Sequence, residues 1–148
     1  MNGSHTFRFQ ILRLAAPAEV QIGLFPAGVC VGDELVSQFD RHSREFIEQH
    51  ELSPRQLAAI GELDRLITRH SGPHNVEFWC SPEPLRVDPR WEEIRGLARA
   101  VLRSMEWEYS TPAQDGSTYA FADGRVVLNE DAPETESKPR KTPWWKFW

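Results

Sequence analysis

Three stretches of this 148-residue chain, 33–50, 54–71 and 88–105, repeat apolar side chains at steps of three and four residues. Such steps bring the repeated side chains to one face of an α-helix, so each stretch predicts an amphipathic helix that buries one side. The repeated positions are Leu35, Phe39, His42 and Phe46, then Leu57, Ile60, Leu63 and Ile67, then Trp91, Ile94, Ala98, Val101 and Met105.

Residues that favour helix ends lie at the borders of these stretches. Asp33 is suited to cap the first helix, and Asp88, followed by a proline, is suited to open the third. Ser53 and Gln56 have the spacing of a capping box ahead of the second helix, and Gly72, followed by a proline, is suited to end it. The sequence therefore predicts the borders of all three helices.

Other stretches alternate apolar and polar side chains, as half-buried strands do. Strands are predicted over 6–14, 20–24 and 75–80, and a weaker alternation at Trp107 and Tyr109 predicts a further one. Asp123 and Gly124 form a favoured two-residue hairpin turn between 118–122 and 125–129. The expected fold is α+β in the order β-β-α-α-β-α-β-β, with three helices on one face of a mostly antiparallel sheet.

The chain divides into two parts by composition. Residues 1–129 carry the periodic patterns and are long enough for one globular domain with its own core. Residues 130–148 are acidic, then basic, and contain prolines but no periodic apolar pattern until the last five positions. They are predicted to form a tether that ends in an aromatic motif, and we call them the C-terminal tail.

Charge and composition narrow the classes of partner. The tail has four acidic and four basic side chains, so the net charge of −5 belongs to residues 1–129. An acidic domain lacks the basic surface that nucleic-acid binding needs. The chain has only two cysteines and neither a secretory leader pattern nor a long apolar segment. These features predict a cytoplasmic protein with reduced thiols, and peripheral contact with the inner membrane is the alternative.

Candidate reactive residues are few. His70 and His74 have the spacing of metal ligands on a helix, with Cys80 six residues further on, but a glycine and a proline separate the histidines and a fourth ligand is missing. Cys30 could act as a nucleophile beside a histidine, or be a small buried thiol. No cofactor motif is present, and the sequence predicts no cofactor, metal or catalytic residue.

Aromatic residues are the strongest candidates for contact with a partner. The last five residues are Trp144, Trp145, Lys146, Phe147 and Trp148. Aromatic anchors of this kind enter pockets on proteins, insert at an anionic membrane surface, or dock on their own domain. Trp79 is predicted to be exposed, because it alternates with Val76, Phe78 and Cys80, and is a second candidate.

These patterns favour a non-enzymatic bacterial interaction protein, such as an adaptor, an inhibitor or an immunity-type protein, over an enzyme. Its partner would be another protein, contacted by the C-terminal tail and the acidic domain. Two alternatives remain open. One is a small enzyme or ligand-binding domain that uses Cys30, His70, His74 and Cys80, and the other is a peripheral membrane protein anchored by the tail.

Overall fold

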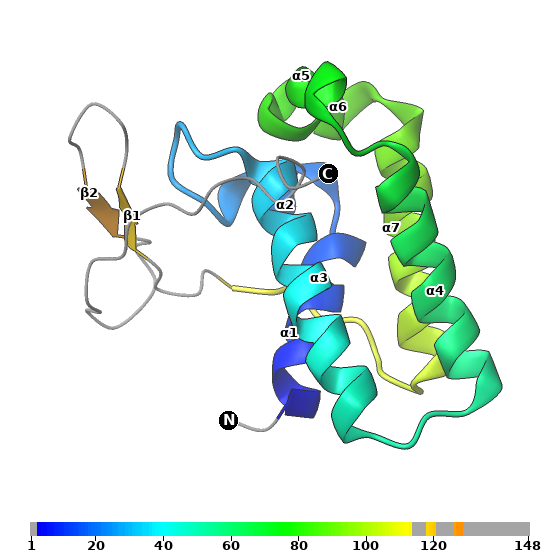
Figure 1. The fold of residues 1–148 in the computed structure, drawn as a ribbon. Coiled ribbons are helices and arrows are strands. Elements are labelled where there is room, and N and C mark those ends of the chain that lie inside the picture. The colour runs from blue at the N-terminus through cyan, green and yellow to red at the C-terminus, as the bar shows by residue number, and fades with distance from the viewer. Residues whose placement is uncertain (1–2, 114–117, 121–125, 129–148) are drawn as a thin grey trace.

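The computed structural model describes residues 3–113, 118–120 and 126–128 of the chain. Helices make up almost all of the regular structure between Gly3 and Ser104 (Figure 1). The elements are α1 (Gly3–Ala15), α2 (Ala18–Gly23), α3 (Val31–Gln49), α4 (Pro54–Arg69), the 3₁₀ turn η1 (Pro73–Asn75), α5 (Val76–Cys80), α6 (Pro82–Val87), α7 (Pro89–Ser104), β1 (Thr118–Ala120) and β2 (Val126–Leu128).

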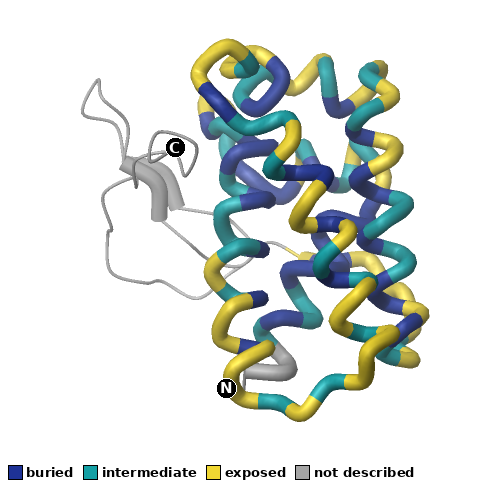
Figure 2. The backbone as a smooth tube through the Cα atoms, turned by 45° about the vertical axis from the view of Figure 1, so that its right-hand side comes forward, coloured by how far each residue is buried: buried dark blue, intermediate teal, exposed yellow. Residues whose placement is uncertain are grey.

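Four longer helices form the body of the molecule. Helix α1 packs against both α3 and α7, and α4 packs against α7. The short helices α5 and α6 lie at one end, opposite the loop that joins α3 to α4 (Figure 1). Buried residues line the inner sides of the helices, and exposed residues follow their outer sides (Figure 2). One apolar core therefore runs between the helices.

The predicted α+β fold is wrong, beginning with the N-terminal strand. The stretch 6–14 lies in helix α1. Phe7, Ile11 and Leu14 are each 0% exposed and follow one another at steps of four and three. The same residues that suggested alternation also fit one face of a helix, and packing against α3 and α7 favours the helix.

The strands predicted over 20–24 and 75–80 are also helical. Alternation over 20–24 would bury Val20 and Ile22 and expose Gln21, but Gln21 is 0% exposed, within α2. The stretch 75–80 forms the end of η1 and then α5. There the adjacent residues Phe78 and Trp79 are both buried. Adjacent side chains of a strand point to opposite faces, so a sheet with one face in solvent would expose one of the two.

The three predicted amphipathic helices are confirmed as α3, α4 and α7. At α4 the capping box is present: Gln56 N donates to Ser53 Oγ at 3.1 Å, and Ser53 N donates to Gln56 Oε1 at 3.0 Å. Asp88 caps α7 by accepting from the backbone N–H of Arg90 at 2.9 Å. The predicted start of α3 is wrong by three residues, because its N-cap is Cys30, whereas Asp33 lies in its first turn.

The described segments of the C-terminal hairpin agree with the prediction. Strands β1 and β2 pair antiparallel, with Tyr119 opposite Val127. The turn at Asp123 and Gly124 and the whole C-terminal tail lie outside the described residues. No strand forms over 105–113, so the strand predicted at Trp107 and Tyr109 is wrong. Within the described residues, no helix has both the length and the apolar character for crossing a bilayer.

Candidate functional site

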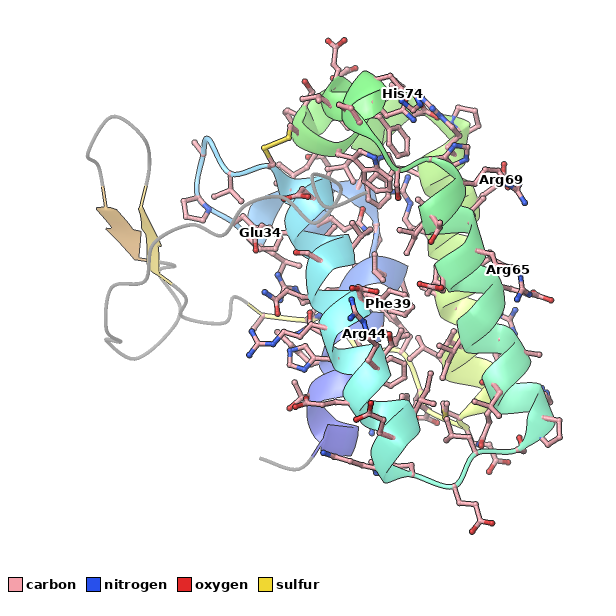
Figure 3. The ribbon with its side chains drawn as sticks, viewed as in Figure 1. Glu34, Phe39, Arg44, Arg65, Arg69 and His74 are labelled. Carbon is pink, nitrogen blue, oxygen red and sulfur yellow. A yellow bond between two sulfur atoms is a disulfide. The ribbon has the colours of Figure 1, made fainter. Side chains whose placement is uncertain are left out.

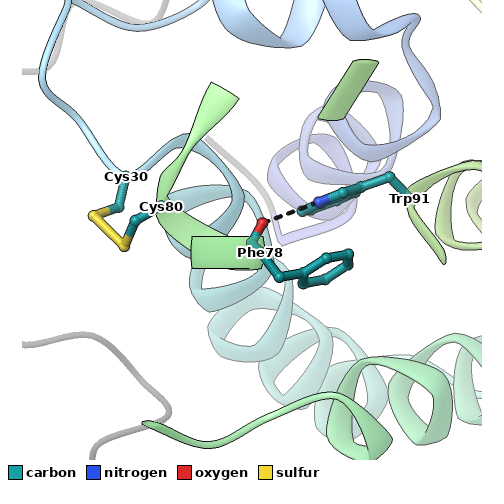
Figure 4. Close-up of a disulfide and its surroundings, with 4 residues drawn as sticks. All are labelled: Cys30, Phe78, Cys80 and Trp91. Carbon is teal, nitrogen blue, oxygen red and sulfur yellow. Dashed lines mark hydrogen bonds between the residues drawn. A yellow bond between two sulfur atoms is a disulfide. The ribbon is translucent and has the colours of Figure 1, made fainter. Parts of the chain in front are cut away.

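Cys30 and Cys80 form a disulfide, which corrects the prediction of reduced thiols (Figure 4). Cys30 lies just before α3 and Cys80 is the last residue of α5. The bond joins two positions 50 residues apart and ties α5 to the start of α3. Neither sulfur carries the thiolate that nucleophilic catalysis would need.

We call residues 73–87, which comprise η1, α5 and α6, the α5–α6 corner. The corner meets α3 at Gly32, where the backbones approach so closely that no side chain fits. A Cβ atom on Gly32 would lie 2.6 Å from Cζ2 of Trp91 and 2.7 Å from the carbonyl oxygen of Trp79. The disulfide and this contact therefore hold the same junction.

An aromatic cluster packs the corner against α7. The ring centroids of Phe78 and Trp79 are 4.7 Å apart, and the centroid of Trp91 lies 5.4 Å from the first and 5.5 Å from the second. The indole N–H of Trp91 donates to the carbonyl oxygen of Phe78 at 3.3 Å (Figure 4). Trp79 is 0% exposed. The prediction that it offers an exposed contact surface is therefore wrong, and it belongs to the core.

Of the two candidate histidines, His74 lies in the corner and His70 at the end of α4 just before it. The carbonyl oxygen of His70 accepts from the indole N–H of Trp79 at 3.0 Å. Burial, with the charges of Arg90 and Arg69, lowers the pKa of His70 below its usual 6.5. His74 is exposed in η1. In the described part of the chain, no group of three or more histidine, cysteine or acidic side chains is arranged to bind a metal ion.

A second site, which the sequence analysis missed, is an open groove between α4 and α7 with a volume of about 360 Å³. We call it the α4–α7 groove. Its lining consists of Glu62, Arg65, Leu66 and Arg69 from α4 and Glu93, Gly96 and Leu97 from α7. The apolar side chains are the more buried ones, and the charged ones are exposed. The groove therefore combines an apolar floor with charged walls.

The charged side chains of the groove do not pair with each other. Among the described residues, none of the four takes part in an ion pair, whereas α7 carries pairs elsewhere, such as Arg95 with Glu92 at 3.0 Å. Arg65 and Arg69 extend from α4 on the outer side of the bundle (Figure 3). Their spacing of four residues places both guanidinium groups on one face, one helical turn apart.

Two features of the sequence could have indicated the groove. Gly96 lies in the middle of α7, where a glycine weakens a helix by about 1 kcal/mol relative to alanine. A Cβ at Gly96 would meet only Arg99 Nη2, at 3.9 Å, so close packing does not account for the glycine. The second signal is the pair Arg65 and Arg69, which have no acidic residue four positions away on the same face of α4.

No known family model matches this sequence, no curated protein is similar to it, and no solved structure matches its fold.

Proposed function

We propose that this protein is a non-enzymatic interaction module that binds a helical segment of another protein in the α4–α7 groove. The observation that carries the proposal is the set of four charged side chains around the groove that form no ion pair with described residues. Charged groups on a protein surface often steer and orient a partner of complementary charge. An adaptor, an inhibitor or an immunity-type protein would use the groove in this way.

The lining of the groove indicates the kind of partner. Two antiparallel helices form the walls of the groove, with Leu66 and Leu97 at its floor. Such a groove suits an amphipathic helix, which lays its apolar face into it. Gly96 leaves room for a side chain of the partner. Arg65 and Arg69 lie one turn apart, so acidic residues at the same spacing on the partner could contact both.

The C-terminal tail is proposed as a second contact. Its residues Trp144, Trp145, Lys146, Phe147 and Trp148 offer aromatic anchors for a pocket on the same partner. Anchoring at an anionic membrane surface remains the alternative for the tail. An enzyme built on Cys30 and Cys80 is not supported, because the disulfide uses both sulfur atoms.

The compartment is also a proposal. The sequence favours a cytoplasmic protein. Disulfides persist mainly in oxidising compartments, and those of the cytosol are mostly transient or regulatory. In a cytoplasmic protein, the bond between Cys30 and Cys80 would therefore be transient or regulatory and not purely structural.

Charge reversal in the groove tests the proposed function. Arg65→Glu and Arg69→Glu should abolish capture of a specific protein in affinity purification, because they place like charge against acidic residues of the partner. Arg55→Glu is the matched control, since Arg55 is exposed on the same helix, lies outside the groove and changes net charge equally. Equal capture of the partner by all three variants would contradict the proposal. A separate variant, truncated after Asn129, measures how much the C-terminal tail contributes to capture.

A further inference from the structure

We propose that the Cys30–Cys80 disulfide is a reversible thiol–disulfide exchange site, and that a dithiol reductant releases the α5–α6 corner from α3 by reducing it. This inference does not rest on the α4–α7 groove or on its partner. It rests on the position of the bond, on the short elements that it holds and on the aromatic side chains beneath them.

The disulfide lies where a reductant can reach it. Cys30 and Cys80 are each partly exposed, whereas Trp79 and Trp91 beside the same junction are fully buried. Both cysteines also lie at the end of an element, one before α3 and the other at the end of α5. Thiol–disulfide exchange requires in-line access of a thiolate to a sulfur atom, which partial exposure at the edge of the fold provides.

The α5–α6 corner depends on outside contacts for its structure. Its three elements have 3, 5 and 6 residues, and helices of this length are not stable alone in water. Helix α5 packs on α3, and α6 packs on α2, α3 and α7. The disulfide is the covalent part of the contact between α5 and α3, so its loss weakens the junction at which Gly32 faces the Trp79 carbonyl.

The other end of the corner has attachments that reduction leaves intact. The carbonyl oxygen of His70, at the end of α4, accepts from Asn75 Nδ2 at 2.8 Å and from Trp79 Nε1 at 3.0 Å. Arg90 lies over the ring of Phe78, with its guanidinium carbon 4.2 Å from the centroid. The corner would therefore swing away from α3 about its attachments to α2, α4 and α7, and would expose part of the aromatic cluster.

The exchange step is a conventional one. A thiolate of the dithiol reductant attacks one sulfur of the disulfide, forms a mixed disulfide and displaces the other cysteine as a thiolate. The second thiol of the reductant then attacks its own sulfur in the mixed disulfide and releases the second cysteine. Two electrons and two protons pass from the dithiol to the protein, which ends with two thiols, while the reductant ends as a cyclic disulfide.

Hydrogen exchange of the full chain, with and without dithiothreitol under native conditions, tests the inference. At the shortest labelling times, amides of residues 73–87 should exchange about tenfold faster or more after reduction, while α1 and α7 keep their protection. Protection should return when oxidised glutathione replaces the dithiol. Unchanged exchange over 73–87, or a bond that dithiothreitol reduces only after unfolding, would overturn the inference.

A double variant, Cys30→Ser with Cys80→Ser, separates the effect of the bond from other effects of the reductant. It should show the exchange pattern of the reduced protein and should not respond to dithiothreitol. Loss of protection in all helices, or failure of the variant to fold, would mean that the disulfide holds the whole domain together, and this too would overturn the inference.

Discussion

At the scale of single residues, a buried polar network shows how this fold tolerates charge in its interior. Gln21 Nε2 donates to the carbonyl oxygens of Arg13 at 3.2 Å and Leu14 at 3.1 Å, and its Oε1 accepts from Arg95 at 2.8 Å. Arg95 also donates to the carbonyl oxygen of Leu85 at 2.9 Å. The network joins α1, α2, α6 and α7, so these polar residues have a structural role, because buried polar groups require partners.

Two histidines give the protein a predictable response to acid. Burial is the largest cause that lowers the pKa of His42 and of His70 below 6.5. The unfolded chain then binds protons more readily than the folded one as the pH falls through 6.5. The contribution of these groups to the free energy of unfolding is therefore complete above that pH and is lost below it.

Urea unfolding at a series of pH values measures this response. We expect the midpoint to fall between about pH 7.5 and about pH 5.5, the range in which histidine titrates. A variant with His42→Gln and His70→Gln should lose most of the slope. A slope that is the same in the variant and the wild type would assign the effect to other groups.

At the scale of elements, the sequence predicts three of the four long helices well, but α1 and the short helices α2 and α5 wrongly. Helices α3, α4 and α7 carry an apolar stripe over four or more turns and are bordered by caps such as Ser53 and Asp88. In α2 and α5 only five or six residues were available, and a helix and a strand cannot be distinguished by periodicity over that length. Tertiary packing then decides the structure, as it also does in α1.

The sites were less predictable from the sequence than the helices. The disulfide joins residues 50 positions apart, and the α4–α7 groove joins residues that only antiparallel packing brings together. The alternation over 75–80 predicts a strand with Trp79 on its exposed face, whereas Trp79 is buried in a helix, so the error in the element is also an error in the site.

Two glycines in helices should respond in opposite ways to alanine. At Gly32 a methyl group would overlap the backbone of Trp79 and the ring of Trp91, so Gly32→Ala should lower the free energy of unfolding by about 3 kcal/mol. At Gly96 the space is open, so Gly96→Ala should raise it by about 1 kcal/mol through helix propensity. Urea unfolding of both variants measures the two effects, and equal effects of the same sign would show that the junction at Gly32 is not tight.

At the scale of the whole molecule, the proposed binding groove and the disulfide occupy different parts of one helical body. The α4–α7 groove lies between two long helices, whereas the disulfide holds α5. Helices α5 and α6 lie at one end of the body (Figure 1). Rigid elements hold a binding surface in place, and short, weakly held elements are the ones that open locally. If both proposals hold, reduction would open the α5–α6 corner and leave the groove intact.

Photo-crosslinking from the groove tests the central claim of a partner bound between α4 and α7. A photoreactive amino acid at Arg65 should crosslink one specific protein, at a helical segment that carries acidic residues one turn apart. The same amino acid at Arg103, which is exposed on α7 and lies outside the groove, should give no such product. Crosslinks of equal yield from both positions, or none from Arg65 when the partner is captured, would contradict the account.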